Sequence, residues 1–228
     1  PPRSTLFPYT TLFRSMQGVH GPLGFTDLDR EGMLIEGFDE LATLATIYNY
    51  PYYTKHLDAL GYIKDVDWFE YEILLDGRNI DQIRKTANLV KEKSKVHLMN
   101  GTKKDLLKYA PQLFEVLDEA YRKLYGTVPL SKSQVQGYIN SYFGFAIPEF
   151  IPILLDENDR VVAFGITFPS FSKALQKSRG NLFPFGFVHF LRAMKKNDTA
   201  DLYLVGVIDK YRGKGLNSLL MVQIYDAF

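Results

Sequence analysis

The stretch LYLVGVIDKYRGKGLNSLLM, residues 202–221, decides the fold. Its first seven residues form an apolar run typical of a buried strand. A loop with glycines at positions 213 and 215 follows, and the apolar residues beyond it predict a helix. Glycines let backbone N–H groups approach an anion, and the first turn of a helix adds partial positive charge. The pattern therefore predicts a phosphate or pyrophosphate site.

Two common phosphate motifs fit this stretch poorly. A P-loop requires Gly-Lys-Ser/Thr, which the chain lacks. A dinucleotide fingerprint requires a third glycine where Ser218 stands. An ordinary turn between a strand and a helix, with solvated lysines, remains the alternative interpretation.

The same stretch resembles the acyl-coenzyme A signature of the GNAT superfamily of N-acyltransferases, in which Gln/Arg-x-x-Gly-x-Gly/Ala joins a strand to a helix. Gly213 and Gly215 match, while Lys210 stands where Gln or Arg is usual. The resemblance implies an α/β fold with a GNAT-like mixed sheet flanked by helices. It implies acyl-CoA as co-substrate, no metal, and transfer of the acyl group to an amine by direct attack.

The resemblance also implies which residues hold the co-substrate. The strand before the loop usually bulges, and a backbone N–H there polarises the thioester carbonyl, which points to Gly206, Val207 and Ile208. Gly206 is equally consistent with simple packing. The pyrophosphate would lie on the loop. Its implied ligands are Lys210, Arg212, Gly213, Lys214, Gly215 and Leu216. No catalytic base or acid is predicted.

The order of elements from residue 95 onward agrees with this resemblance. A strand is predicted at 95–99, helices at 105–124 and 132–143, and a hairpin at 150–168 around a polar turn. A short helix at 172–178 and an aromatic stretch at 181–196 precede the final strand. Residues 95–228 are therefore expected to be the N-terminal part of a GNAT-like domain.

The upstream sequence TLATIYNYPYYTKHLDALGYIKDVDWFEYEI, residues 43–73, resembles the strand, helix and strand that close such a domain. Strands are expected at 40–48 and 67–75 and a helix at 52–60. The reading is two incomplete copies: residues 16–78 end a first copy, 79–94 form a linker helix, and 95–228 begin a second. The motifs GPLGF, EGF and YNYPYY resemble a bacterial two-copy family to which some ceramide-synthase-like acyltransferases are similar.

The two ends of the chain carry their own expectation. Codons for TLFPYTTLFRS, residues 5–15, can spell a common short-read sequencing adaptor, so residues 1–15 are expected to be an artefact. At the other end the chain stops within an amphipathic helix. A piece truncated at both ends is therefore expected, and this piece itself is expected to be inactive.

Composition limits the classes of partner that the protein is expected to bind. A net charge of +1 argues against nucleic acid, and the absence of cysteine suits a reducing compartment. A cytoplasmic location is therefore expected, at the inner face of the membrane in one alternative. The substrate is expected to be a small-molecule or lipid amine.

The stretch from Phe183 to Lys196 combines aromatic and basic residues, which indicates core packing, a membrane-surface helix or a substrate lid. A peripheral membrane contact is therefore among the expected partners. The alternative functions are a non-catalytic GNAT-like binding or scaffold protein and a membrane-associated lipid N-acyltransferase.

Overall fold

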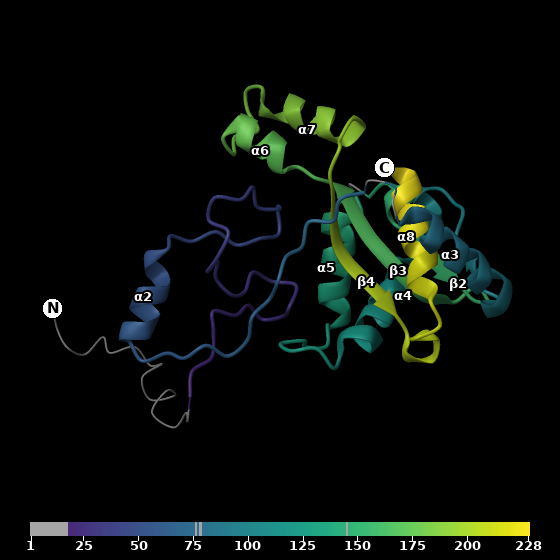
Figure 1. The fold of residues 1–228 in the computed structure, drawn as a ribbon, viewed down its shortest axis with the longest axis horizontal. Coiled ribbons are helices and arrows are strands. Elements are labelled where there is room, and N and C mark those ends of the chain that lie inside the picture. The colour runs from purple at the N-terminus through teal and green to yellow at the C-terminus, as the bar shows by residue number, and fades with distance from the viewer. Residues whose placement is uncertain (1–17, 76, 78, 145) are drawn as a thin grey trace.

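A computed structural model describes residues 18–75, 77, 79–144 and 146–228 (Figure 1). The predicted artefact at residues 1–15 lies outside the described residues. The centre of the fold is a four-stranded sheet in the order β1-β2-β3-β4, with every neighbouring pair antiparallel. The strands are β1 (His97–Leu98), β2 (Ile153–Leu155), β3 (Val161–Pro169) and β4 (Ala200–Val207).

The α/β class is confirmed, but the predicted mixed sheet is wrong for the described residues, because all three strand pairings are antiparallel. A parallel neighbour requires a crossover connection, usually a helix. The helix after β4, α8 (Leu216–Ala227), is the last described element, so no parallel strand follows it there.

Helices cover both faces of the sheet (Figure 1). On one face lie α4 (Lys103–Tyr121) and α5 (Lys132–Tyr142). On the other lie α3 (Ile80–Ser94) and α8. Strand side chains alternate between the two layers, so Ile153 and Leu155 join the α4 core while Leu154 joins the α8 core. Short 3₁₀ turns, η2 (Pro148–Phe150) and η3 (Asp209–Tyr211), precede β2 and follow β4.

The helix predicted as a linker at residues 79–94 forms α3 and belongs to this core. Its Ala87 and Val90 are buried in the cluster that contains Leu216 and Leu220 of α8. Arg84 also pairs with the carboxylate of Asp226 at the far end of α8. Residues 80–94 therefore complete the layer that covers the second face of the sheet.

Residues 18–75 are mostly irregular. The predicted helix is confirmed as α2 (Tyr52–Ala59), but the strands predicted at 40–48 and 67–75 are wrong. An alternating pattern becomes a strand only when a neighbour accepts its backbone hydrogen bonds, and none does so among the described residues. The side chain of Asn49 instead binds the backbone N–H (2.7 Å) and C=O (3.1 Å) of Leu34.

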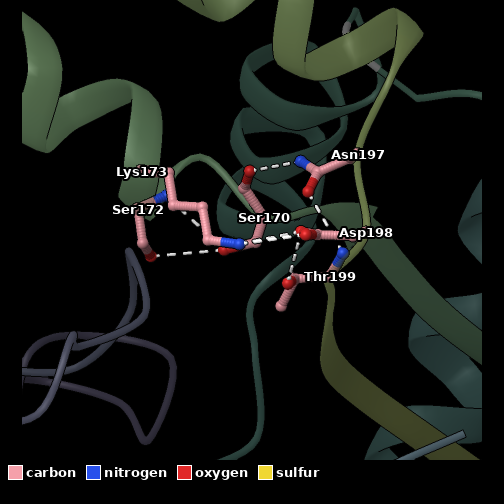
Figure 2. A network of polar contacts seen from close by, with 6 residues as sticks. All are labelled: Ser170, Ser172, Lys173, Asn197, Asp198 and Thr199. Carbon is pink, nitrogen blue, oxygen red and sulfur yellow. Dashed lines mark hydrogen bonds and ion pairs between the residues drawn. The ribbon is translucent and has the colours of Figure 1, made fainter.

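A helical hairpin, α6 (Ser172–Ser178) and α7 (Gly186–Lys195), connects β3 to β4 and stands off the end of the sheet (Figure 1). Polar contacts tie its base together (Figure 2). Asn197 Nδ2 donates to the carbonyl of Ser170 at 2.6 Å, and Lys173 pairs with Asp198 at 2.9 Å. No helix in the described part of the chain is both long and apolar enough to cross a membrane.

Candidate functional site

The loop between β4 and α8 presents unpaired backbone donors. Gly213 and Gly215 have φ angles of +71° and +80°, which side chains rarely tolerate, and they turn the chain into α8. The N–H groups of Gly213, Gly215, Leu216 and Asn217 donate no hydrogen bond within the described residues. Such donors at a helix N-terminus form an anion-binding surface.

Two of the three predicted basic ligands remain near this loop. The ammonium groups of Lys210 and Lys214 lie 5.3 and 5.2 Å from the centre of the Tyr211 ring, and both side chains are exposed. The two lysines therefore share one aromatic ring and can bring two positive charges to one ligand.

The third predicted basic ligand, Arg212, is already bound by other residues of the protein. Its guanidinium donates to the carbonyl of Ala120 at the end of α4 and pairs with Asp209 at 3.3 Å. The backbone N–H of Asp209 in turn donates to Glu119 Oε1 at 2.8 Å. Arg212 therefore anchors the loop to α4 instead of extending toward an anion.

The three predicted thioester contacts differ in the direction of their backbone N–H groups, which point either toward β3 or toward the opposite edge of β4. The N–H of Ile208 donates to the carbonyl of Val162 at 3.0 Å. Gly206 pairs with Phe164, and alternation along an antiparallel strand directs its N–H in the same direction, toward β3. Only Val207 directs its N–H to the edge of β4 that has no neighbour among the described residues. Val207 is therefore the one of the three that can donate to a ligand there.

Gly206 is explained by packing. A Cβ at this position would lie 2.7 Å from Cε1 of the Phe164 ring, so the ring occupies the space of a side chain. The predicted bulge does occur in β4, but earlier: Ile166 pairs with Leu204 and Thr167 with Leu202, which leaves Tyr203 as the extra residue.

The backbone of Val205, which also faces the free edge, is bound by a side chain. Tyr121 from α4 donates its hydroxyl to the carbonyl of Val205 and accepts from the N–H of Val205, both at 3.3 Å. Burial is the main cause that raises the pKa of Tyr121, and the charge of Asp27 adds to it. Tyr121 therefore remains a neutral hydroxyl at physiological pH and closes the edge at this position.

Asp201, at the start of β4, is the one buried carboxylate among the described residues, with 7% of its surface exposed. Its Oδ2 has no hydrogen-bond partner there. Burial raises the pKa of Asp201, and the neighbouring charge of Glu70 raises it further, while the hydroxyls of Ser170 and Tyr203 oppose the shift. Burial and the Asp201 charge also raise the pKa of Tyr203 to about 12. A buried carboxylate with a raised pKa is suited to exchange protons.

α3 closes one side of the glycine loop. A Cβ on Gly215 would lie 2.9 Å from Cγ2 of Val90, so α3 packs directly against the loop. Between them lies a cavity of about 330 Å³. Its lining residues are Thr86, Leu89, Val90, Lys93, Ser94 and Lys214. The cavity combines apolar contacts with two ammonium groups, so it suits an anionic ligand that has an apolar part.

Sequence reasoning missed two parts of this site, Tyr121 and the α3 wall, and it also missed the buried Asp201 at the opposite end of β4. An acid at the head of an otherwise apolar strand is a signal for Asp201 that the sequence carries. Tyr121 lies 84 residues from its partner Val205, and no local pattern connects them.

The structure thus defines an antiparallel α/β protein with a glycine loop of unpaired N–H donors at the N-terminus of α8. No protein-family model matches the chain. The chain is 22% identical over 212 residues to Protein YghO of Escherichia coli (strain K12). The match covers 92% of this chain and 54% of YghO, so the chain spans about half the length of that relative.

Proposed function

We propose that the protein binds an acyl-coenzyme A and transfers its acyl group to an amine, as an N-acyltransferase of the GNAT type. The observation that carries the proposal is the group of four unpaired N–H donors beside Lys210 and Lys214, directly after the free edge of β4. Donors and charges of this kind suit a pyrophosphate.

The residues have separate roles in this proposal. The loop amides and the two lysines bind the pyrophosphate, and the N–H of Val207 donates to the thioester carbonyl. The bound thioester supplies the activated acyl group. The attacking amine gives its proton to water, and the coenzyme A sulfur leaves as a thiolate that takes a proton from water. Asp201 is not assigned to this step, because it lies at the opposite end of β4 from Val207, about 20 Å away along the strand.

A second candidate is a GNAT-like protein that binds the co-substrate or a partner without catalysis. Two contacts favour it: Tyr121 binds the edge of β4 at Val205, and Arg212 is bound by Ala120 and Asp209. Both contacts use groups that could otherwise face a ligand.

Titration calorimetry with acetyl- and palmitoyl-CoA tests the binding site. Lys210→Gln combined with Lys214→Gln removes two charges, and we expect at least a tenfold loss of affinity, since charge-assisted contacts contribute about 1.5–3 kcal/mol each. Lys108→Gln is the matched control, because Lys108 also lies over a tyrosine ring, 5.4 Å from the centre of Tyr109, but far from the loop. Equal affinities in all three proteins would refute the proposed site.

Release of free thiol from the acyl-CoA in the presence of a panel of amines separates the two candidates. For an enzyme, thiol is released when an acceptor amine is added, and the rate at low acyl-CoA concentration falls in the variant that combines Lys210→Gln with Lys214→Gln. Binding without thiol release for any amine would favour the non-catalytic candidate.

A further inference from the structure

The connection between β3 and β4 is far longer than the sheet requires. Antiparallel neighbours can be joined by two residues, yet residues 170–199 intervene here and form α6 and α7. The two helices stack through Phe171 and Phe190, whose ring centres are 5.5 Å apart. Their turn is tight, since a Cβ on Gly186 would lie 1.7 Å from the carbonyl oxygen of Asn181. The hairpin is therefore a packed structural unit and not an irregular loop.

The turn and the outer face of α7 are apolar and exposed. Phe183 is 80% exposed and Phe185 73%. The other large apolar residues exposed on this surface are Leu182, Phe187, Val188 and Leu191. Core packing, one of the three interpretations of this stretch, is therefore wrong for these side chains. We call residues 182–191 the apolar tip.

Positive charge surrounds the apolar tip. Residues 170–197 contain six lysines and arginines and no acidic residue, whereas the whole chain has a net charge of only +1. These residues are Lys173, Lys177, Arg179, Arg192, Lys195 and Lys196. Apart from Lys173, none of them forms an ion pair within the described part of the chain. This density of free positive charge is complementary to an anionic surface.

Two backbone N–H groups of the tip are hydrogen-bonded to carbonyls within it. Phe187 donates its N–H to the carbonyl of Leu182 at 2.8 Å, and Val188 donates to Phe185 at 3.1 Å. An unpaired backbone group is costly in an apolar medium. The tip can therefore enter such a medium with these donors satisfied.

We propose that the α6–α7 hairpin docks the protein on an anionic lipid bilayer. The apolar tip enters the interfacial region, and Arg192, Lys195 and Lys196 contact the acidic headgroups. The protein lies on the membrane and does not span it. The inference is independent of acyl transfer, because none of these residues belongs to the loop or to β4.

Co-sedimentation with vesicles tests the proposal. The complete chain is mixed with vesicles of phosphatidylcholine or of phosphatidylcholine and phosphatidylglycerol in equal parts. We expect binding to the anionic vesicles that weakens as salt is raised. Phe183→Ser with Phe185→Ser lowers the partition constant about tenfold or more. Lys195→Gln with Lys196→Gln lowers it by about tenfold on anionic vesicles only.

The matched control is Phe69→Ser with Tyr71→Ser, which removes aromatic rings that are 72% and 78% exposed outside the hairpin. These substitutions leave the partition constant unchanged if the hairpin is the docking surface. An equal loss in the control, or no binding to anionic vesicles, overturns the proposal. Binding to a DNA oligonucleotide instead of the vesicles, with the same dependence on Lys195 and Lys196, would assign the hairpin to nucleic acid and also overturn it. Circular dichroism shows that each variant is folded.

Discussion

Residues 18–75 and residues 80–228 contain similar apolar side chains, but the earlier region leaves most of them exposed while the later region buries many of them. In the later region, continuous apolar runs lie in strands between two helical layers, and the adjacent Ile153 and Leu154 are both fully buried. In the earlier region Thr26 is the only buried residue that the structure describes. Trp68 and Ile73, from the alternating stretch at 67–75, are 53% and 76% exposed. The difference shows that an alternating pattern specifies a strand only where a partner strand and a covering layer exist.

Polar contacts help to hold the earlier region to the later one, beside the packing of Leu28 against the α4 core and of Trp68 on Tyr125. Asp27 accepts from Thr127 at 3.3 Å, and Asp65 accepts from the hydroxyl of Tyr125. The contact with Asp65 is the main cause that raises the pKa of Tyr125 to about 12. Asp27 also contributes to the raised pKa of Tyr121, so the two regions are electrostatically linked close to β4.

The same substitution in each region gives the largest expected contrast. Phe164 is 1% exposed and Phe69 is 72% exposed. Phe164→Ala leaves a cavity between β3 and α4 and lowers the free energy of unfolding by about 3–5 kcal/mol. Phe69→Ala changes it by less than about 0.5 kcal/mol. Urea unfolding followed by circular dichroism measures both, and equal losses would contradict the contrast.

A glycine pair tests whether β4 is as tightly packed as its contacts indicate. Gly206→Ala drives a methyl group into the Phe164 ring and lowers the free energy of unfolding by about 1–3 kcal/mol. Gly137→Ala, in α5 with no atom within 4 Å of the new Cβ, raises it by roughly 0.5–1 kcal/mol. Unfolding of the two variants in urea should therefore shift in opposite directions. A Gly206→Ala protein as stable as the parent would remove the packing explanation for this glycine.

Asp201 gives a pH-dependent prediction. Because its folded-state pKa lies above the ordinary 3.8, the folded chain binds more protons than the unfolded chain between the two values. The Asp201 contribution to stability is therefore lost as the pH rises through that window. Asp201→Asn removes this loss, so the free energy of unfolding of the variant does not fall as the pH rises through the window.

Urea unfolding of the parent and Asp201→Asn across the acidic range measures the difference. Glu70→Gln gives a second test, because removal of the Glu70 charge lowers the folded-state pKa of Asp201. The pH range between the unfolded-state and folded-state pKa values of Asp201 then becomes narrower. A parent and an Asp201→Asn variant that differ by a constant amount at every pH would contradict this account.

Helix caps give the smallest contrast. Ser131 accepts a hydrogen bond from the N–H of Gln134 at 3.3 Å at the start of α5. Ser131→Ala lowers the free energy of unfolding by about 0.5 kcal/mol, since the cap is exposed. α2 has no side-chain cap. Thr54→Ala in its first turn is expected to leave global unfolding unchanged within error, and thermal melts of the two variants compare them.

Most elements after residue 80 could be predicted, because local signals and the final fold agree there. Ser131 and Gln134 form the capping box that starts α5, and the polar turn at 156–160 joins β2 to β3. The loop glycines at 213 and 215 adopt the left-handed conformations that such a loop requires. The strands predicted at 40–48 and 67–75 do not form. Whether an alternating segment becomes a strand depends on neighbouring strands that the local sequence does not specify.

The sequence by itself determined the strand–glycine loop–helix unit, since backbone conformation at Gly213 and Gly215 is a local property. It also determined the basic, aromatic character of residues 181–196. Only the tertiary structure decided that Arg212 binds α4, that Val207 alone of three candidates faces the open edge, and that α3 walls the loop. Each of these depends on strand register or on contacts between residues distant in the chain, which local patterns do not encode.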